Sequence, residues 1–182
     1  KAFTLIELLV VIVIIGILSG IGISQFSTYQ SKARDSKRIQ QFSQTVRLLK
    51  QHVTTNQKLP TLTSAIPSAC AGWRVANSVH KEKIIEFESD HNYDFNEEYF
   101  DECEGFSFYK YPAGSNGCPI EKGAHIVFGA TLEQTKNNTK TLQDLSLSEY
   151  DFQCPSRVWR VESRFGNGPV FGIFENGDSG SQ

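Results

Sequence analysis

The chain begins with an unusually long apolar segment. No Asp, Glu, Lys or Arg occurs from Leu8 to Ser31, and Leu8–Ile23 is almost wholly aliphatic. These 24 residues would span roughly 36 Å as an α-helix, enough to cross a hydrocarbon core of about 30 Å. The pattern therefore predicts a membrane-spanning helix at the N-terminal end.

After Ser24 the apolar pattern narrows to one stripe. Apolar residues recur at alternating steps of three and four positions, with Arg, Lys and Gln between them: Ile39, Phe42, Val46, Leu49 and Val53. This period is typical of one face of an α-helix. We expect one continuous helix from about Phe3 to about Thr54, ended by Asn56 and Pro60.

Strand-like segments follow the helix. Their β-branched and aromatic residues lie between turn-forming residues, in Phe106–Tyr111, His125–Leu132, Val158–Ser163 and Val170–Phe174. The sequence predicts an α+β fold in which a roughly four-stranded antiparallel sheet covers the helical stripe and buries Ile39, Phe42, Val46 and Leu49. The Gly- and Ser-rich tail Glu175–Gln182 is expected to be mobile.

Composition narrows the function classes only slightly. A net charge of -2 gives no general reason to expect nucleic acid as a partner. The cluster Lys32, Arg34, Lys37 and Arg38 is interrupted by Asp35, so a solvated face is favoured over a DNA-binding patch. Four cysteines, Cys70, Cys103, Cys118 and Cys154, lie outside the apolar segment and without CxxC spacing. They favour two disulfides over unpaired thiols, and three pairings remain open.

Glu7 is the residue that the apolar segment does not explain. An unpaired carboxylate in a bilayer is unfavourable, and the next Lys or Arg is Lys32, about 38 Å along the helix. A plain membrane anchor gains nothing from such a charge. A cleaved secretory signal would have a shorter apolar run and would not continue into a helix. The partner of Glu7 is therefore expected from another molecule or from a chain terminus.

Residues Lys1–Ile12 (KAFTLIELLVVI) resemble the processing and assembly signature of type IV pilins and pseudopilins, the class III signal. The resemblance implies that a prepilin peptidase cuts between Ala2 and Phe3 and methylates the new amine. Gly is the usual residue where Ala2 stands. In the family, Glu is the fifth residue counted from that Phe, and counting from Phe3 gives Glu7. With Thr4 in the same signature, Glu7 is expected to meet the Phe3 amine of a neighbouring subunit.

The resemblance also implies a domain organisation, the pilin fold. Residues 1–2 would be a leader remnant, 3–31 the hydrophobic helix of the membrane or filament core, 32–54 its amphipathic half, and 55–182 a globular head. Gly16, Gly20 and Gly22 either allow close helix packing or weaken the helix during assembly.

The function that the resemblance implies is structural, not enzymatic. The subunit would wait in the inner membrane and be assembled by the pilus machinery into a helical homopolymer on the cell surface. Adhesion, twitching motility and DNA uptake are the roles of such fibres. The alternative is a pseudopilin of a type II secretion system.

One acidic segment resembles a calcium loop. Its oxygen-bearing residues occupy relative positions 1, 3, 5, 7, 9 and 12: Asp90, Asn92, Asp94, Asn96, Glu98 and Asp101. Phe95 stands where the loop needs Gly, so a solvated acidic surface is the competing interpretation. No other cofactor is expected.

Overall fold

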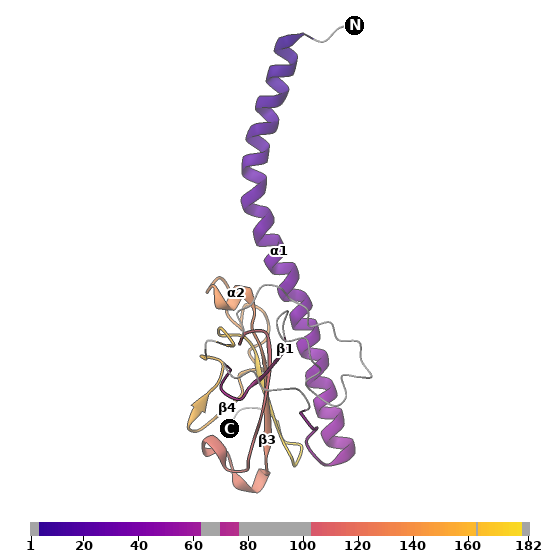
Figure 1. Cartoon of the computed structure of the whole chain (residues 1–182), viewed down its shortest axis with the longest axis vertical. Helices are drawn as coiled ribbons and strands as arrows, with labels where there is room; N and C mark the ends of the chain where they lie inside the picture. The colour runs from indigo at the N-terminus through magenta and orange to yellow at the C-terminus, as the bar shows by residue number, and fades with distance from the viewer. Residues whose placement is uncertain (1–3, 63–69, 77–102, 163, 180–182) are drawn as a thin grey trace.

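A single N-terminal helix is the longest element of the protein. In the computed structural model, α1 runs from Leu5 to Asn56, 52 residues in all. Gln57, in a left-handed conformation with φ 52°, ends it and donates its N–H to the Val53 carbonyl at 2.8 Å. Figure 1 shows the first half of α1 projecting from the molecule and the second half lying along the head. The continuous helix predicted from the sequence is confirmed.

The structure describes residues 4–62, 70–76, 103–162 and 164–179, and for residues 21–25 the backbone alone. Within these residues, no helix combines the length and the apolarity that crossing a membrane requires.

The head is built on one antiparallel sheet in the order β1-β2-β3-β6. Its strands are β1 (Arg74–Ala76), β2 (Phe106–Tyr111), β3 (His125–Ala130) and β6 (Val170–Phe174). A small hairpin, β4 (Gln153–Cys154) with β5 (Arg157–Val158), lies outside it. Short helices η3 (Ser115–Gly117), η4 (Ile120–Lys122) and α2 (Glu133–Lys136) connect the strands. The predicted α+β fold, a long helix on a four-stranded antiparallel sheet, is confirmed.

One predicted strand is wrong. Strands β2 and β6 have the predicted bounds and β3 ends two residues early. Of the predicted strand Val158–Ser163, the described residues 158–162 contribute only Val158 to a strand, the two-residue β5. The chain turns directly afterwards, where the N–H of Glu162 donates to the Trp159 carbonyl at 2.9 Å. The fourth strand of the sheet is β1, which the sequence pattern does not predict.

Alternate side chains of the strands pack into two separate cores, because successive side chains point to opposite sheet faces. On one face, the first core joins α1 to the sheet, and the ring of Phe42 stacks on Phe128 at 4.9 Å. Val46, Leu49 and Val53 are buried in this core as well. Ile39 is only half-buried and packs against a smaller cluster of Leu132, Leu142 and Leu147.

The second core lies on the other face of the sheet. It contains the three buried cysteines, with the half-buried Cys103 packed against them, and several large aromatic side chains: Trp73, Trp159, Phe152 and Phe165. Gly172 brings β6 close to this layer, since a Cβ there would overlap the Phe152 ring. The helix therefore covers one sheet face, and loop residues cover the other.

Candidate functional site

The first turn of α1 is closed by a reciprocal capping box between Thr4 and Glu7. Glu7 Oε2 accepts hydrogen bonds from the Thr4 N–H at 2.8 Å and from Thr4 Oγ1 at 2.7 Å. The Glu7 N–H in turn donates to Thr4 Oγ1 at 3.4 Å. The sequence predicts a role in assembly for both residues. This contact was not predicted, although an S/T-x-x-E pattern at a helix start indicates it. Ala2 and Phe3 lie outside the described residues.

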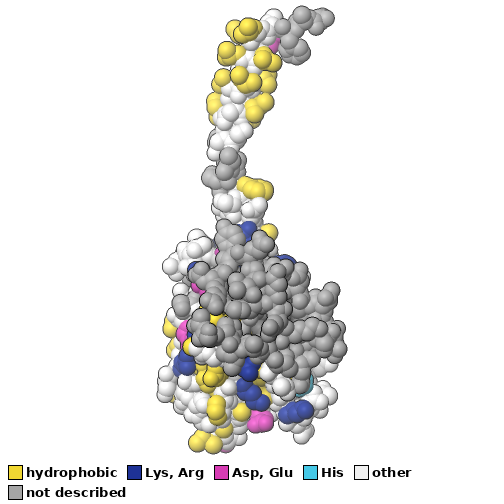
Figure 2. Space-filling model, viewed as in Figure 1, with side chains coloured by type: hydrophobic (Ala, Val, Ile, Leu, Met, Phe, Trp, Pro, Cys, Tyr) yellow, Lys and Arg dark blue, Asp and Glu magenta, His cyan; other side chains and the backbone are white. Residues whose placement is uncertain are grey.

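The projecting half of α1 is an exposed apolar surface. Its aliphatic side chains from Leu5 to Leu18 are all half or more exposed, with fractions from 82% at Leu5 to 50% at Val10. Figure 2 shows hydrophobic side chains covering this part of the helix on the face in view. A contiguous apolar surface of this kind on a protein marks an interaction with another protein or with lipid.

Glycines interrupt that surface without interrupting the helix. Gly16, Gly20 and Gly22 all lie in helical backbone. A Cβ added at Gly16 or Gly20 would meet nothing within 4 Å. The single subunit therefore has no steric need for glycine at these two positions. Close packing against another helix and weakening of α1 during assembly both stay predictions.

A buried ionic cluster joins α1 to α2 below the projecting half. Arg38 donates hydrogen bonds of 2.8 Å to Asp35 and to Glu133, and Arg34 makes a bidentate contact with Glu133 at 2.7 and 2.8 Å. Asp35 accepts the backbone N–H groups of Glu133 and Gln134, both at 2.9 Å. The solvated face expected for these basic residues is thus wrong for Arg38, which is fully buried, and for the paired Arg34.

The two arginines of this cluster offset the effect of burial on the pKa of Glu133. Burial alone would raise the pKa of Glu133, but the hydrogen bonds and positive charges of Arg38 and Arg34 outweigh it and lower that pKa below its ordinary value of 4.5. Glu133 is therefore ionised at neutral pH. The cluster fixes the α2 end of the head to a defined position on α1, just where the helix leaves the head.

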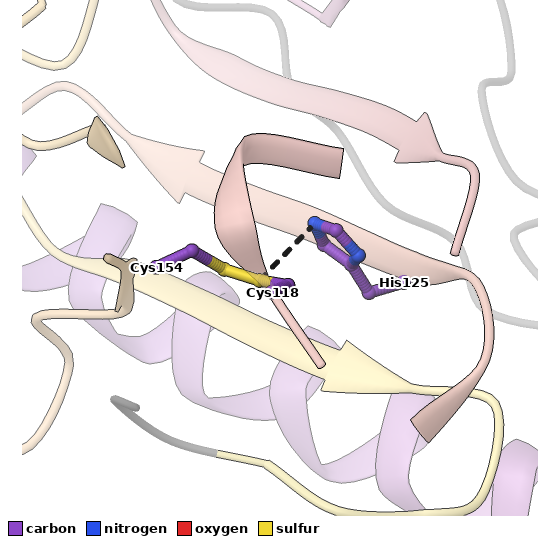
Figure 3. Close-up of side chains that lie close together, drawn as sticks. All are labelled: Cys118, His125 and Cys154. Carbon is purple, nitrogen blue, oxygen red and sulfur yellow. Dashed lines mark hydrogen bonds between the residues drawn. A yellow bond between two sulfur atoms is a disulfide. The ribbon is translucent and has the colours of Figure 1, made fainter. Parts of the chain in front are cut away.

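The structure selects one of the three cysteine pairings. Cys70 pairs with Cys103 and Cys118 with Cys154, with Cα atoms 5.2 Å apart in both pairs. The second pair lies in the second core beside His125, whose Nε2 is 3.9 Å from Cys118 Sγ (Figure 3). Burial lowers the pKa of His125 to about 4, so the imidazole is neutral at neutral pH.

The described residues do not include the predicted calcium loop. Asp90, Asn92, Asp94, Asn96, Glu98 and Asp101 all lie outside the described residues. Calcium binding by these side chains stays a prediction.

Comparison with known proteins identifies the N-terminal segment. Residues 1–23 match the family model of the prokaryotic N-terminal methylation motif. No curated protein and no solved structure matches the chain. The matched residues include the Thr4–Glu7 capping box and most of the exposed apolar surface, and the motif is typical of structural subunits, not of an enzyme family. The chain therefore carries the class III signal of type IV pilins and pseudopilins.

Proposed function

We propose that this protein is the structural subunit of a type IV pilus filament and that it polymerises through the first half of α1. The observation that carries the proposal is the exposed apolar surface from Leu5 to Leu18, directly attached to the methylation motif. A surface of that extent is unfavourable in water. Membrane lipid before assembly, and α1 helices of other subunits afterwards, would cover it.

Glu7 is proposed to set the register of assembly. Cleavage between Ala2 and Phe3 would create a positive amine one residue before Thr4, whose N–H and hydroxyl already hold the Glu7 carboxylate. In the filament, that carboxylate would pair with the Phe3 amine of a neighbouring subunit. Two buried opposite charges stabilise each other, whereas either alone is strongly unfavourable, so only one axial offset between subunits neutralises both.

The head then forms the outside of the fibre. Residues 3–31 would build the filament core, and residues 32–54 with the head at 55–182 would surround it. The stored monomer would sit in the inner membrane until the prepilin peptidase and the assembly machinery act on it. Two disulfides in the head fit a durable surface fibre that serves adhesion, twitching motility or DNA uptake.

The test replaces Glu7 by Ala and, separately, by Gln, which keeps the size but not the charge. Glu121→Ala is the matched control, because Glu121 is an exposed acidic residue of the head. Filaments are sheared from cells, and the amount of subunit in the sheared fraction is compared with the amount in the membrane fraction. Both Glu7 variants should be processed and retained in the membrane, with the sheared yield at least about tenfold lower, since an unpaired buried charge is costly.

Two outcomes would contradict the proposal. A normal sheared yield from Glu7→Ala would show that the carboxylate does not set the register. Processed wild-type protein found only in the cell envelope, with none in the sheared fraction, would favour the pseudopilin of a type II secretion system.

A further inference from the structure

Three soft or borderline metal-ligating atoms meet in the second core. The Sγ atoms of Cys118 and Cys154 and a ring nitrogen of His125 all lie within 4.8 Å of one another. Figure 3 shows that these side chains converge from separate parts of the chain. Cys118 follows η3, His125 is the first residue of β3, and Cys154 belongs to β4. In the structure the two sulfurs are joined as a disulfide; once they are reduced, two thiols and an imidazole would have the ligand chemistry of a metal site.

His125 has unused bonding capacity in this position. Its side chain is fully buried, and its Nδ1 has no hydrogen-bond partner among the described residues. Its Nε2 faces Cys118 Sγ at 3.9 Å, a weak contact at best. A buried imidazole with so little bonding is costly, and coordination of a cation by this ring would offset that cost.

The surroundings of the cluster are aromatic. The ring centroids of Tyr111 and Phe174 lie 5.2 Å from that of His125, and those of Phe152 and Trp159 lie 6.1 and 6.2 Å away. Cys118 and Cys154 are themselves buried. A shell of rings limits water access and holds the three ligating side chains in place, which favours binding through the protein's own atoms.

We propose that the chain with reduced Cys118 and Cys154 binds one thiophilic d10 cation, Zn²⁺ or Cu⁺, through these two sulfurs and His125. The metal-bound form and the disulfide form are alternatives, because each uses the same two sulfur atoms. The newly made chain carries thiols, so the metal form is available before oxidation. Since the site is closed in the folded head, the ion enters as the head folds.

The two forms differ in electron balance. Metal binding displaces two thiol protons to water and transfers no electrons. Formation of the Sγ–Sγ bond removes two protons and two electrons from the thiols. The electrons pass to the disulfide of a thiol–disulfide exchange partner, which leaves as a dithiol.

The two candidate ions make different demands on the site. Zn²⁺ with two thiolates is electrically neutral, but structural zinc takes four ligands, and the described residues supply only three to this cluster. A water molecule would have to complete its shell. Cu⁺ is satisfied by three soft donors but leaves a net negative charge. The experiment therefore has one arm for each ion.

The test uses the full chain in detergent, unfolded and reduced anaerobically with a phosphine. The chain is then refolded with Zn²⁺ or Cu⁺ in competition with a coloured chelator, because the ion enters as the head folds. Two double variants form a matched pair, because each removes two cysteines: C118S/C154S and C70S/C103S. One equivalent of ion should bind to the wild type and to C70S/C103S, and none to C118S/C154S. His125→Asn should bind at least about tenfold more weakly.

A second measurement does not depend on the variants folding. The oxidised wild-type chain should bind no ion, and X-ray absorption of the reduced, loaded wild type should show two sulfur ligands and one imidazole nitrogen. Absence of binding by the reduced chain to both ions would overturn the proposal. So would equal binding by the oxidised chain, or a ligand shell without sulfur.

Discussion

Arg38 donates a 2.8 Å hydrogen bond to Glu133, although 95 residues separate the two and both side chains are buried. The same guanidinium nitrogen also reaches Asp35, one helical turn away, at 2.8 Å. The pair is therefore part of a charge network whose centre is buried and whose outer member, Arg34, is partly exposed. The network lies where α1 leaves the head. It therefore connects the projecting half of α1, which is proposed to polymerise, to the head, which is proposed to form the outside of the fibre.

Loss of Arg38 should destabilise the head strongly. Arg38→Ala would leave Asp35 buried without its cation and Glu133 with Arg34 alone, and breaking a buried pair costs about 3–5 kcal/mol. The matched control is Arg47→Ala on the same helix, where the exposed side chain should matter by less than about 0.5 kcal/mol. Urea denaturation of the full chain in detergent measures both. Equal free energies of unfolding for the two variants would contradict the network's role.

The same network predicts how stability depends on acid. The pKa of Glu133 in the folded chain is lower than the ordinary 4.5 that it takes when unfolded. Its contribution is therefore fully present above about pH 4.5 and is lost as the pH falls through the lower folded pKa. The charged groups of α1 that face Glu133 are Arg34, Asp35 and Arg38. On α2 itself, Lys136 is paired with Glu104.

Glu133→Gln isolates that contribution. The variant should be less stable than the wild type at neutral pH, and its free energy of unfolding should fall less steeply between about pH 5 and pH 3. Unfolding curves recorded across that range supply the comparison. Parallel curves for the two proteins would mean that Glu133 does not carry the acid sensitivity.

Gly16 and Gly20 should matter to the filament and not to the subunit. A Cβ at either position meets nothing within 4 Å in the single chain, and Ala stabilises a helix by about 1 kcal/mol relative to Gly. The variant G16A/G20A should therefore leave the melting of the head unchanged and reduce the yield of sheared filaments. Ser19→Ala, an exposed position between the two, is the control. An undiminished filament yield from the double variant would show that Gly16 and Gly20 have no role in assembly.

Local patterns of the sequence account for most of the fold. The stripe of Phe42, Val46, Leu49 and Val53 predicted both α1 and its buried face, because a helical period is a property of neighbouring residues. Strand β1 was missed because three residues carry too little alternation to stand out. The strand predicted from Val158 onward does not form because Trp159 enters the second core from a turn, where its burial does not need a strand.

Long-range pairing could not be read in the same way. Arg38 was assigned to a solvated face because its partner Glu133 lies far away in the sequence and only the docking of α2 on α1 brings the two together. The cysteine pairing and the approach of His125 to Cys118 likewise depend on how the second core closes over the sheet. The methylation motif is the opposite case, because its information lies within residues 1–23.

As a pilin, the protein would be processed at the motif of residues 1–23, and the processed chain would form a surface filament. Mass spectrometry of the N-terminal peptide, from sheared filaments and from the membrane fraction separately, tests it most directly. We expect a peptide that begins at Phe3, carries one added methyl group, and is abundant in the sheared fraction. An intact Lys1-Ala2-Phe3 junction in both fractions would contradict it.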